Sequence, residues 1–222
     1  DDGRYLAEAT LPASDLVAGW PSGTMAATWR ENPLRRLDRA ASPGIACGVT
    51  HYDYQQRLHG LWTKAVEQYK SGQRGADSFF NADETAWLLA NGLTAQELYD
   101  FAEDFNNAEE PDFTTFAMVQ EVRRSFFLHT LGGKHRDDKI DPATYPAKTD
   151  AVDGIEWLPR LIEKAKAKLH GRLDSDTMYG CGGDRRFFKT HDLHPAEFLA
   201  FVRDHPDDDR AVINFVKQRS PA

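Results

Sequence analysis

A short glycine-rich run, residues 180–186 (Gly-Cys-Gly-Gly-Asp-Arg-Arg), combines a thiol, a carboxylate and two guanidinium groups at a predicted helix start. Backbone N–H groups of such a turn, together with the positive end of a helix dipole, can converge on a phosphate or a carboxylate. The alternative is a tight turn whose arginines contact the chain's own carboxylates. The spacing differs from that of a P-loop, and the Lys-Ser/Thr ending is missing. The residues of this predicted anion site are Gly182, Gly183, Asp184, Arg185 and Arg186.

The cysteine of this run, Cys181, could carry chemistry of its own. A helix start and neighbouring arginines favour a thiolate, which is the form that acts as a nucleophile or a redox sensor. A hydrolase also needs a base, and His191 or His194 could supply it by folding back. The alternative is a small buried cysteine that only fills space. These three residues are the candidate catalytic groups, and the sequence leaves open whether the protein is an enzyme.

Metal ligands are sparse. His191 and His194 could offer two ligands from one turn, but no third ligand is indicated. The acidic run 207–209 lacks the alternating ligands of a calcium loop. Two cysteines, Cys47 and Cys181, are too few for a disulfide framework or a structural zinc site. We therefore expect no metal and no cofactor.

The helix that precedes the glycine-rich run is predicted from hydrophobic periodicity. Apolar residues between 157 and 169 recur at the spacing of one helix face, and Gly171 is placed to end the helix. The charged residues of this segment are expected on the opposite, solvated face. They include Lys164 and Lys168.

Three more short helices are predicted after it. Asp184 is expected to cap the first of them, and His194 the second, in which Glu197 can bond back to the cap. Residues 207–209 place acidic groups at the start of the third, where free N–H groups are exposed. The segment 153–222 is thus predicted to be a module of four short helices.

A similar pattern lies 100 residues upstream. Residues 58–104 align without a gap with residues 158–204, and the eight identities fall at core and cap positions in one register. A capping box at Thr94–Glu97 stands where His194–Glu197 does the same job. We interpret this as a tandem repeat of one helical module, with the two copies sharing a core. Strand signals are weak throughout, so the fold class is expected to be all-α.

The remaining segments set the domain boundaries. Residues 1–50 are broken by prolines and are expected to form an irregular N-terminal arm. The first helical module is assigned to residues 51–133, and it closes with a helix that follows Asp112. Residues 134–152 carry many charges without periodicity and are expected to be the linker to the second module, residues 153–222.

Composition limits the classes of function. The chain has 222 residues and a net charge of −8, which argues against a nucleic acid or an anionic membrane as its partner. No apolar run approaches the roughly 20 residues that a membrane helix needs, so a soluble, acidic protein is expected. The first residue is Asp, so a leader removed upstream would be invisible, and a cytoplasmic location is the default expectation.

The second module resembles a bacterial family known only as a domain of unknown function, DUF5069. The resemblance rests on residues 157–169, 179–187 and 195–199, and it covers about residues 153–219. The first module looks like a diverged relative, because residues 81–86 (Asn-Ala-Asp-Glu-Thr-Ala) stand where residues 181–186 stand in the second. The resemblance implies the helical fold and brings no activity with it.

These observations favour a non-catalytic helical module that binds a protein partner or a small anionic ligand, with the space between the two repeats as one place for it. The alternative is a thiol-dependent enzyme or redox protein that uses Cys181, with Arg185 steadying the thiolate. A structural role in a larger assembly is a third possibility. The sequence does not predict the oligomeric state.

Overall fold

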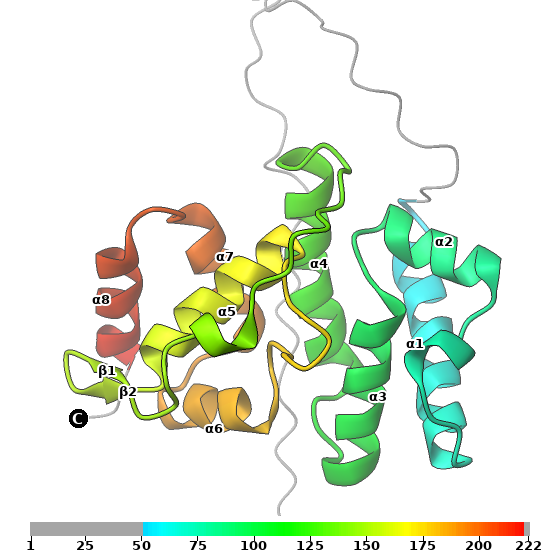
Figure 1. The fold of residues 1–222 in the computed structure, drawn as a ribbon, viewed down its shortest axis with the longest axis horizontal. Coiled ribbons are helices and arrows are strands. Elements are labelled where there is room, and N and C mark those ends of the chain that lie inside the picture. Colours follow the sequence, from blue (N-terminus) through cyan, green and yellow to red (C-terminus); the bar gives the residue numbers. More distant parts are fainter. Residues whose placement is uncertain (1–50, 220–222) are drawn as a thin grey trace, which may run out of the picture. The chain divides into compact units, whose positions relative to one another are not determined.

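A computed structural model describes residues 51–219 of the chain, and they fold into eight α-helices with one small β-hairpin. The expected all-α fold class is confirmed (Figure 1). The predicted arm, residues 1–50, lies outside the described residues. The helices are α1 (Tyr54–Lys70), α2 (Ala82–Ala90), α3 (Ala95–Ala108), α4 (Phe113–His129), α5 (Leu158–His170), α6 (Gly182–Thr190), α7 (Pro195–Asp204) and α8 (Asp209–Arg219). Short 3-10 turns occur at Ala76–Ser78 and Pro142–Thr144.

Helix positions repeat along the chain with the offset seen in the sequence. Helices α2 and α6 begin and end 100 residues apart, and α3 and α7 begin 100 residues apart. The capping box at Thr94 is present, with Glu97 accepting a hydrogen bond from the Thr94 backbone N–H at 2.9 Å. In α7 the expected box is absent, since His194 accepts from Ala196 N through its ring while Glu197 pairs with Arg219 at 2.6 Å. The equal spacing supports the duplication, which stays an inference.

The hairpin was not predicted. Strands β1 (Ala151–Val152) and β2 (Ile155–Glu156) pair in antiparallel register across Asp153-Gly154, and both turn residues have positive φ, 51° and 80°. Asp-Gly is the sequence that such a two-residue turn prefers. The Asp153 carboxylate accepts hydrogen bonds from Arg210 and Lys217 of α8, which fixes the hairpin to the second module.

The segment expected to be a linker packs on the second module. It has no helix apart from the 3-10 turn, but Tyr145 within it is buried. The Ile140 N–H donates to the carbonyl of Arg172 at 2.9 Å, and Lys139 Nζ donates to the carbonyl of Gly171 at 2.7 Å. Residues 134–150 therefore cover part of the second module.

Helix α5 confirms the predicted apolar face and corrects the polar one. Leu158, Leu161 and Leu169 are buried, and Gly171 ends the helix in the left-handed conformation at φ +67°. Lys164 and Lys168, which were expected to face water, are only 3% and 2% exposed. Periodicity assigns a charged residue to the solvated face, whereas these two lysines find acidic partners on other elements.

Two hydrophobic clusters form instead of one shared core, and α4 contributes to both. The first cluster joins α1, α2 and α3 and includes Phe116 and Ala117 of α4, while the second joins α5 to α8 and includes Val119 and Phe126 of the same helix. Figure 1 shows α4 between the two groups of helices. Successive faces of one helix therefore cover two cores.

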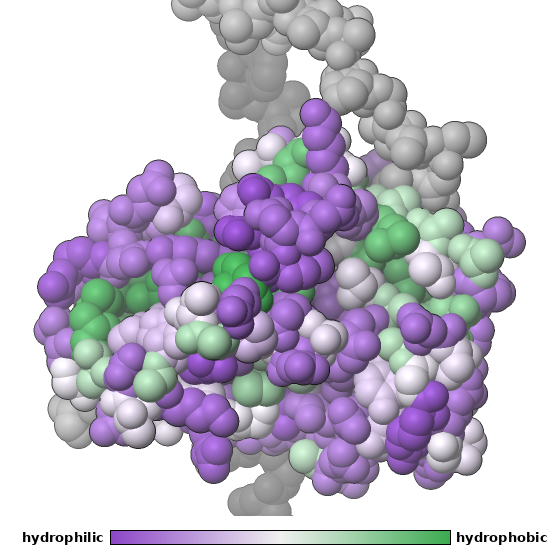
Figure 2. Space-filling model, viewed as in Figure 1, coloured by the Kyte–Doolittle hydropathy of each residue, from purple (hydrophilic) through white to green (hydrophobic). Residues whose placement is uncertain are grey.

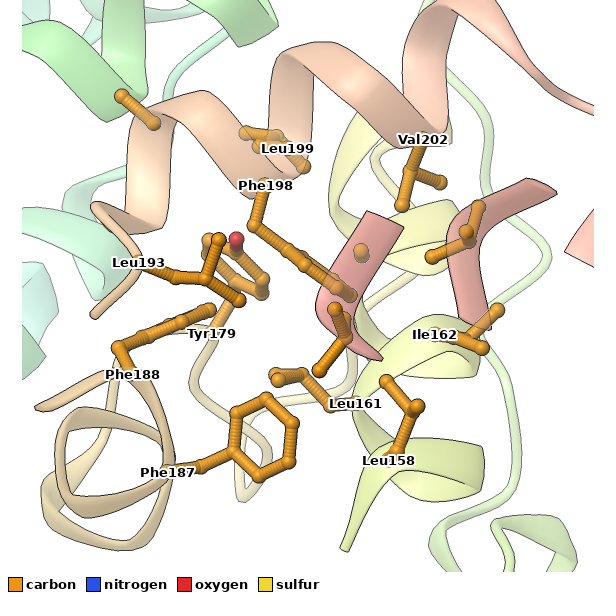
Figure 3. Close-up of a cluster of buried hydrophobic side chains, with 14 of the residues drawn as sticks. Leu158, Leu161, Ile162, Tyr179, Phe187, Phe188, Leu193, Phe198, Leu199 and Val202 are labelled. Carbon is orange, nitrogen blue, oxygen red and sulfur yellow. The ribbon is translucent and has the colours of Figure 1, made fainter. Parts of the chain in front are cut away.

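The second cluster is rich in aromatic rings (Figure 3). Phe188 lies between Tyr179 and Phe198, with ring centroids 6.0 and 5.6 Å away. Aliphatic side chains of α5 close the cluster from the other side. The molecular surface seen in Figure 2 is mostly hydrophilic and its hydrophobic residues form separate patches. This packing fixes the chain segments before and after α6, where the glycine-rich run lies.

Candidate functional site

Asp184 of the glycine-rich run is a buried structural anchor. It was expected to cap α6, but the cap is Cys181, and Asp184 is the third residue inside the helix with no exposed surface. Its carboxylate accepts hydrogen bonds from Lys164 Nζ at 2.5 Å, Trp157 Nε1 at 2.9 Å and Gly180 N at 2.8 Å. A buried carboxylate needs such partners, because an unpaired one would be strongly destabilising. Asp184 therefore holds the turn to α5.

The two glycines that follow Cys181 differ in their surroundings. A Cβ atom on Gly183 would collide with the Trp157 ring, 2.6 Å from Cη2. A Cβ on Gly182 would have Arg185 Nη2, at 3.7 Å, as its near neighbour. Gly183 is therefore required so that the indole can lie over the helix start and reach Asp184. Gly182 is exposed and makes no such demand.

Of the two arginines, one is engaged by the protein's own carboxylates. Arg185 donates from Nη1 to Asp104 at 2.6 Å and to the Gly180 carbonyl at 2.9 Å, and its Nε lies 3.6 Å from Glu110. Arg186 is exposed. This arrangement agrees with the alternative given for the glycine-rich run, in which its arginines contact the protein's own carboxylates instead of a bound anion. It also links α6 to α3 of the first module.

The structure places a lysine beside the Cys181 thiol. Lys164 Nζ lies 3.4 Å from Sγ, and no disulfide joins Cys181 to a described residue. His191 caps the opposite end of α6, and nine helical residues at 1.5 Å each separate the two ends by about 14 Å. His194 caps α7 with its ring nitrogen. Helix α6 therefore keeps His191 away from the thiol, and the ionisable neighbour of Cys181 is Lys164.

A cavity of about 240 Å³ lies between the two modules. Helix α3 contributes Glu97 and Asp100, α4 contributes Arg123, α5 contributes Lys168, and residues 171–179 close it. Three helices thus bring two acidic and two basic side chains to one place. The sequence predicts a binding site between the two repeats but does not identify these residues as its lining.

Lys168 and Glu97 form an ion pair at the cavity wall. The ammonium group donates to Glu97 Oε1, and also to Gln120 Oε1 at 3.1 Å. Burial raises the pKa of Glu97, but the charge and hydrogen bond of Lys168 outweigh that effect, so the net shift is downward. Because Glu97 also belongs to the capping box at Thr94, this pair ties the start of α3 to α5.

Arg123 combines burial with a hydrogen-bond donor that the described residues leave unpaired. Its side chain is 2% exposed, and among the described residues Nη1 has no hydrogen-bond partner. The guanidinium carbon lies 5.1 Å from the centre of the Phe127 ring. A Cβ on Gly171 would lie 2.6 Å from Nη2, so that glycine leaves room for the guanidinium. Buried donors in native proteins are nearly always paired, so Nη1 is a place where a ligand or water would bind.

Asp100 supplies the second acidic group. Burial raises its pKa to about 7, and the nearby charges of Glu97, Glu103 and Asp104 add to this effect. Its Oδ1 accepts one hydrogen bond, from Gln96 Nε2 at 2.7 Å. A carboxylate has about four acceptor positions, so Asp100 keeps capacity for a further donor.

Comparison with known families concerns the second module. A family model described as Domain of unknown function (DUF5069) matches residues 145–222. This segment is a DUF5069 domain. The match begins at Tyr145, earlier than the expected boundary at 153, and so includes that buried tyrosine and the β-hairpin. No curated protein and no solved structure matches the chain.

The DUF5069 domain supplies one side of the cavity. Lys168, Gly171 and Tyr179 belong to the domain, while Asp100 and Arg123 come from the preceding helices. Within residues 51–219, no three His, Cys, Asp or Glu side chains are placed to hold a metal ion. In the same range no helix is both long and apolar enough to cross a membrane. The cavity is thus built jointly by the DUF5069 domain and the first module.

Proposed function

We propose that this protein binds a small anionic molecule in the cavity between its two helical modules. The observation that carries the proposal is the buried guanidinium of Arg123, whose Nη1 lacks a partner at the cavity wall. Leaving a buried donor unpaired costs about 1–3 kcal/mol, and more for a charged group. A bound carboxylate or phosphate would accept from Nη1 and remove that cost. Arginine suits this task because its planar fork matches both anions.

The cavity favours a small metabolite. Its volume of about 240 Å³ is below the range of roughly 300–1,000 Å³ typical of sites for drug-sized ligands. The pocket also has apolar walls, which Phe101 and Leu173 provide beside the charged groups. An anionic head at Arg123 and a short chain against these walls would use both features.

The cavity is a better anion site than the glycine-rich turn. Arg185 already contacts Asp104 and Glu110, and Asp184 places a second negative charge inside the helix start. An anion at the turn would have to displace one carboxylate and approach another. The turn stays a prediction from the sequence, and the experiment below distinguishes the two places.

A thermal-shift screen of small carboxylates and phosphates tests the proposal with wild type, Arg123→Lys, Arg185→Ala and the exposed control Arg186→Ala. A ligand at 100 times its Kd adds about 2.7 kcal/mol of stability, which is about 5–10 °C for a protein of this size. We expect at least one compound to stabilise wild type and both control variants but not Arg123→Lys, since a lysine cannot reproduce the fork.

Two results would contradict it. A shift that survives Arg123→Lys and disappears in Arg185→Ala would place the anion at the glycine-rich turn. The absence of any shift across the whole panel, with folded proteins, would reject small-anion binding altogether. Binding of a protein partner would then be the better interpretation of the sequence.

A thiol-dependent reaction at Cys181 is the second candidate, and the ammonium of Lys164 at 3.4 Å from Sγ favours it. Such a cation stabilises a thiolate. Alkylation by iodoacetamide at pH 6 should then be fast in wild type and slow in Lys164→Met. Equal, slow alkylation of both folded proteins would identify Cys181 as a packing residue.

A further inference from the structure

The charges around the inter-module cavity are balanced. Arg123, Lys139 and Lys168 are basic, and Glu97, Asp100 and Asp174 are acidic. A site for a simple anion is normally surrounded by an excess of positive charge. The three carboxylates offset the three cations, so this cavity lacks the excess of positive charge that would favour a phosphate dianion.

Pairing within the wall leaves one buried basic group and two acidic groups with free hydrogen-bonding positions. Lys139 is solvent-exposed and donates to the Gly171 carbonyl, while Asp174 accepts from the Asp176 N–H at Oδ1 and has a buried Oδ2 without a partner among the described residues. Lys168 and Glu97 neutralise each other in an ion pair, and Gln120 Oε1 accepts a further hydrogen bond from the ammonium. Arg123 Nη1 has no partner among residues 51–219, and Asp100 has a single neutral donor, Gln96. A ligand that satisfies both must carry an anionic and a cationic group.

Resting on the proposed function, we infer that the ligand is a small amino carboxylate, with its carboxylate on Arg123 and its protonated amine on Asp100. The two positions lie on two helices of the first module, α4 and α3, around one small cavity. The compact size of a free amino acid fits that volume, and its side chain would meet Phe101 and Leu173.

The inference gives binding a pH dependence. The pKa of Asp100 is about 7 because the group is partly buried beside Glu97, Glu103 and Asp104, with Lys168 as the opposing charge from α5. An ammonium ligand would interact with the ionised form. Binding of an amino carboxylate should therefore weaken as the pH falls from 8 to 6.

Calorimetric titration with matched pairs of compounds tests this directly. The probes are L-alanine and propionate, L-aspartate and succinate, and L-glutamate and glutarate, each at pH 7.5. We expect the amino member of at least one pair to bind about tenfold or more tightly than its partner, because a charged hydrogen bond is lost without the amine. Asp100→Asn should remove that preference, whereas the exposed control Asp83→Asn should keep it.

The outcomes separate this inference from the proposed function. Equal binding of amino and plain carboxylates, still lost in Arg123→Lys, would overturn the amino-carboxylate assignment and leave the anion site standing. A preference that persists in a folded Asp100→Asn would also overturn it. No binding by any of the six compounds, and no thermal shift in the wider screen, would overturn both.

Discussion

Replacing each of the two adjacent glycines by alanine tests how the glycine-rich turn is built. Gly182 and Gly183 are both in the first turn of α6, and neither has a positive φ. Their backbone requirements are therefore similar. They differ in what a methyl group would meet, which is open surface near Arg185 for Gly182 and the Trp157 ring for Gly183.

The expected changes in the free energy of unfolding differ in sign between the two alanine variants. Alanine is about 0.5–1 kcal/mol better than glycine within a helix, so Gly182→Ala should be neutral or slightly stabilising. Gly183→Ala has the same helix-propensity gain, but the added methyl group overpacks the Trp157 ring, which costs about 1–3 kcal/mol of stability. Moving the indole also breaks its hydrogen bond to the buried Asp184 carboxylate, worth about 1.5–3 kcal/mol. The net loss for Gly183→Ala is about 2–5 kcal/mol.

Urea unfolding followed by circular dichroism measures both variants against wild type. A loss of 1 kcal/mol corresponds to about 2–4 °C in Tm for a protein of this size, so thermal melts should show the same order. The reasoning would be refuted if Gly183→Ala were as stable as Gly182→Ala, or if both variants lost equal stability. Either result would mean that Trp157 does not lie against the start of α6.

Three further predictions concern charged groups. Lys164→Met leaves the Asp184 carboxylate buried without its cation and should lower the free energy of unfolding by about 3–5 kcal/mol. The double variant with Asp184→Asn should recover part of that loss. Equal melting temperatures for Lys164→Met and wild type would contradict this prediction. Asp100 has a folded-state pKa of about 7, above its ordinary 3.8, so the native state binds more protons between these values and loses stability as pH rises. The stability of Asp100→Asn relative to wild type should therefore increase from pH 4 to pH 8, by up to about 4 kcal/mol. If urea unfolding shows the same difference between the two proteins at every pH, this prediction is wrong. Arg185→Ala should lower the free energy of unfolding, measured with urea, by about 2 kcal/mol because the hydrogen bond to Asp104 is lost. A variant as stable as wild type would count against this link between the modules.

Local patterns were enough to predict most helices. The apolar stripe of α5, its end at Gly171 and the capping box at Thr94 each depend on residues within a few positions of one another. The Asp153-Gly154 turn was equally local, and it was missed because two-residue strands are too short to show alternation. Element type can be read from the chain when the deciding contacts are near in sequence.

The charged groups of the candidate site depend on distant contacts. Lys164 and Lys168 look like solvated residues until Asp184 and Glu97 are placed beside them, 20 and 71 residues away. For Arg123 a signal existed. It follows Phe116 by seven positions, which puts a charge on the apolar face of α4. A lone charge on an apolar stripe could have marked the cavity.

The dual role of α4 also bears on which part of this chain folds as one unit. The domain begins at Tyr145, after α4 has ended, yet its aromatic cluster is completed by Val119 and Phe126 of that helix. A chain of residues 145–222 by itself would expose this contact to solvent. In this chain the unit that packs as one core is therefore larger than the segment that the family model matches, because it includes a face of α4.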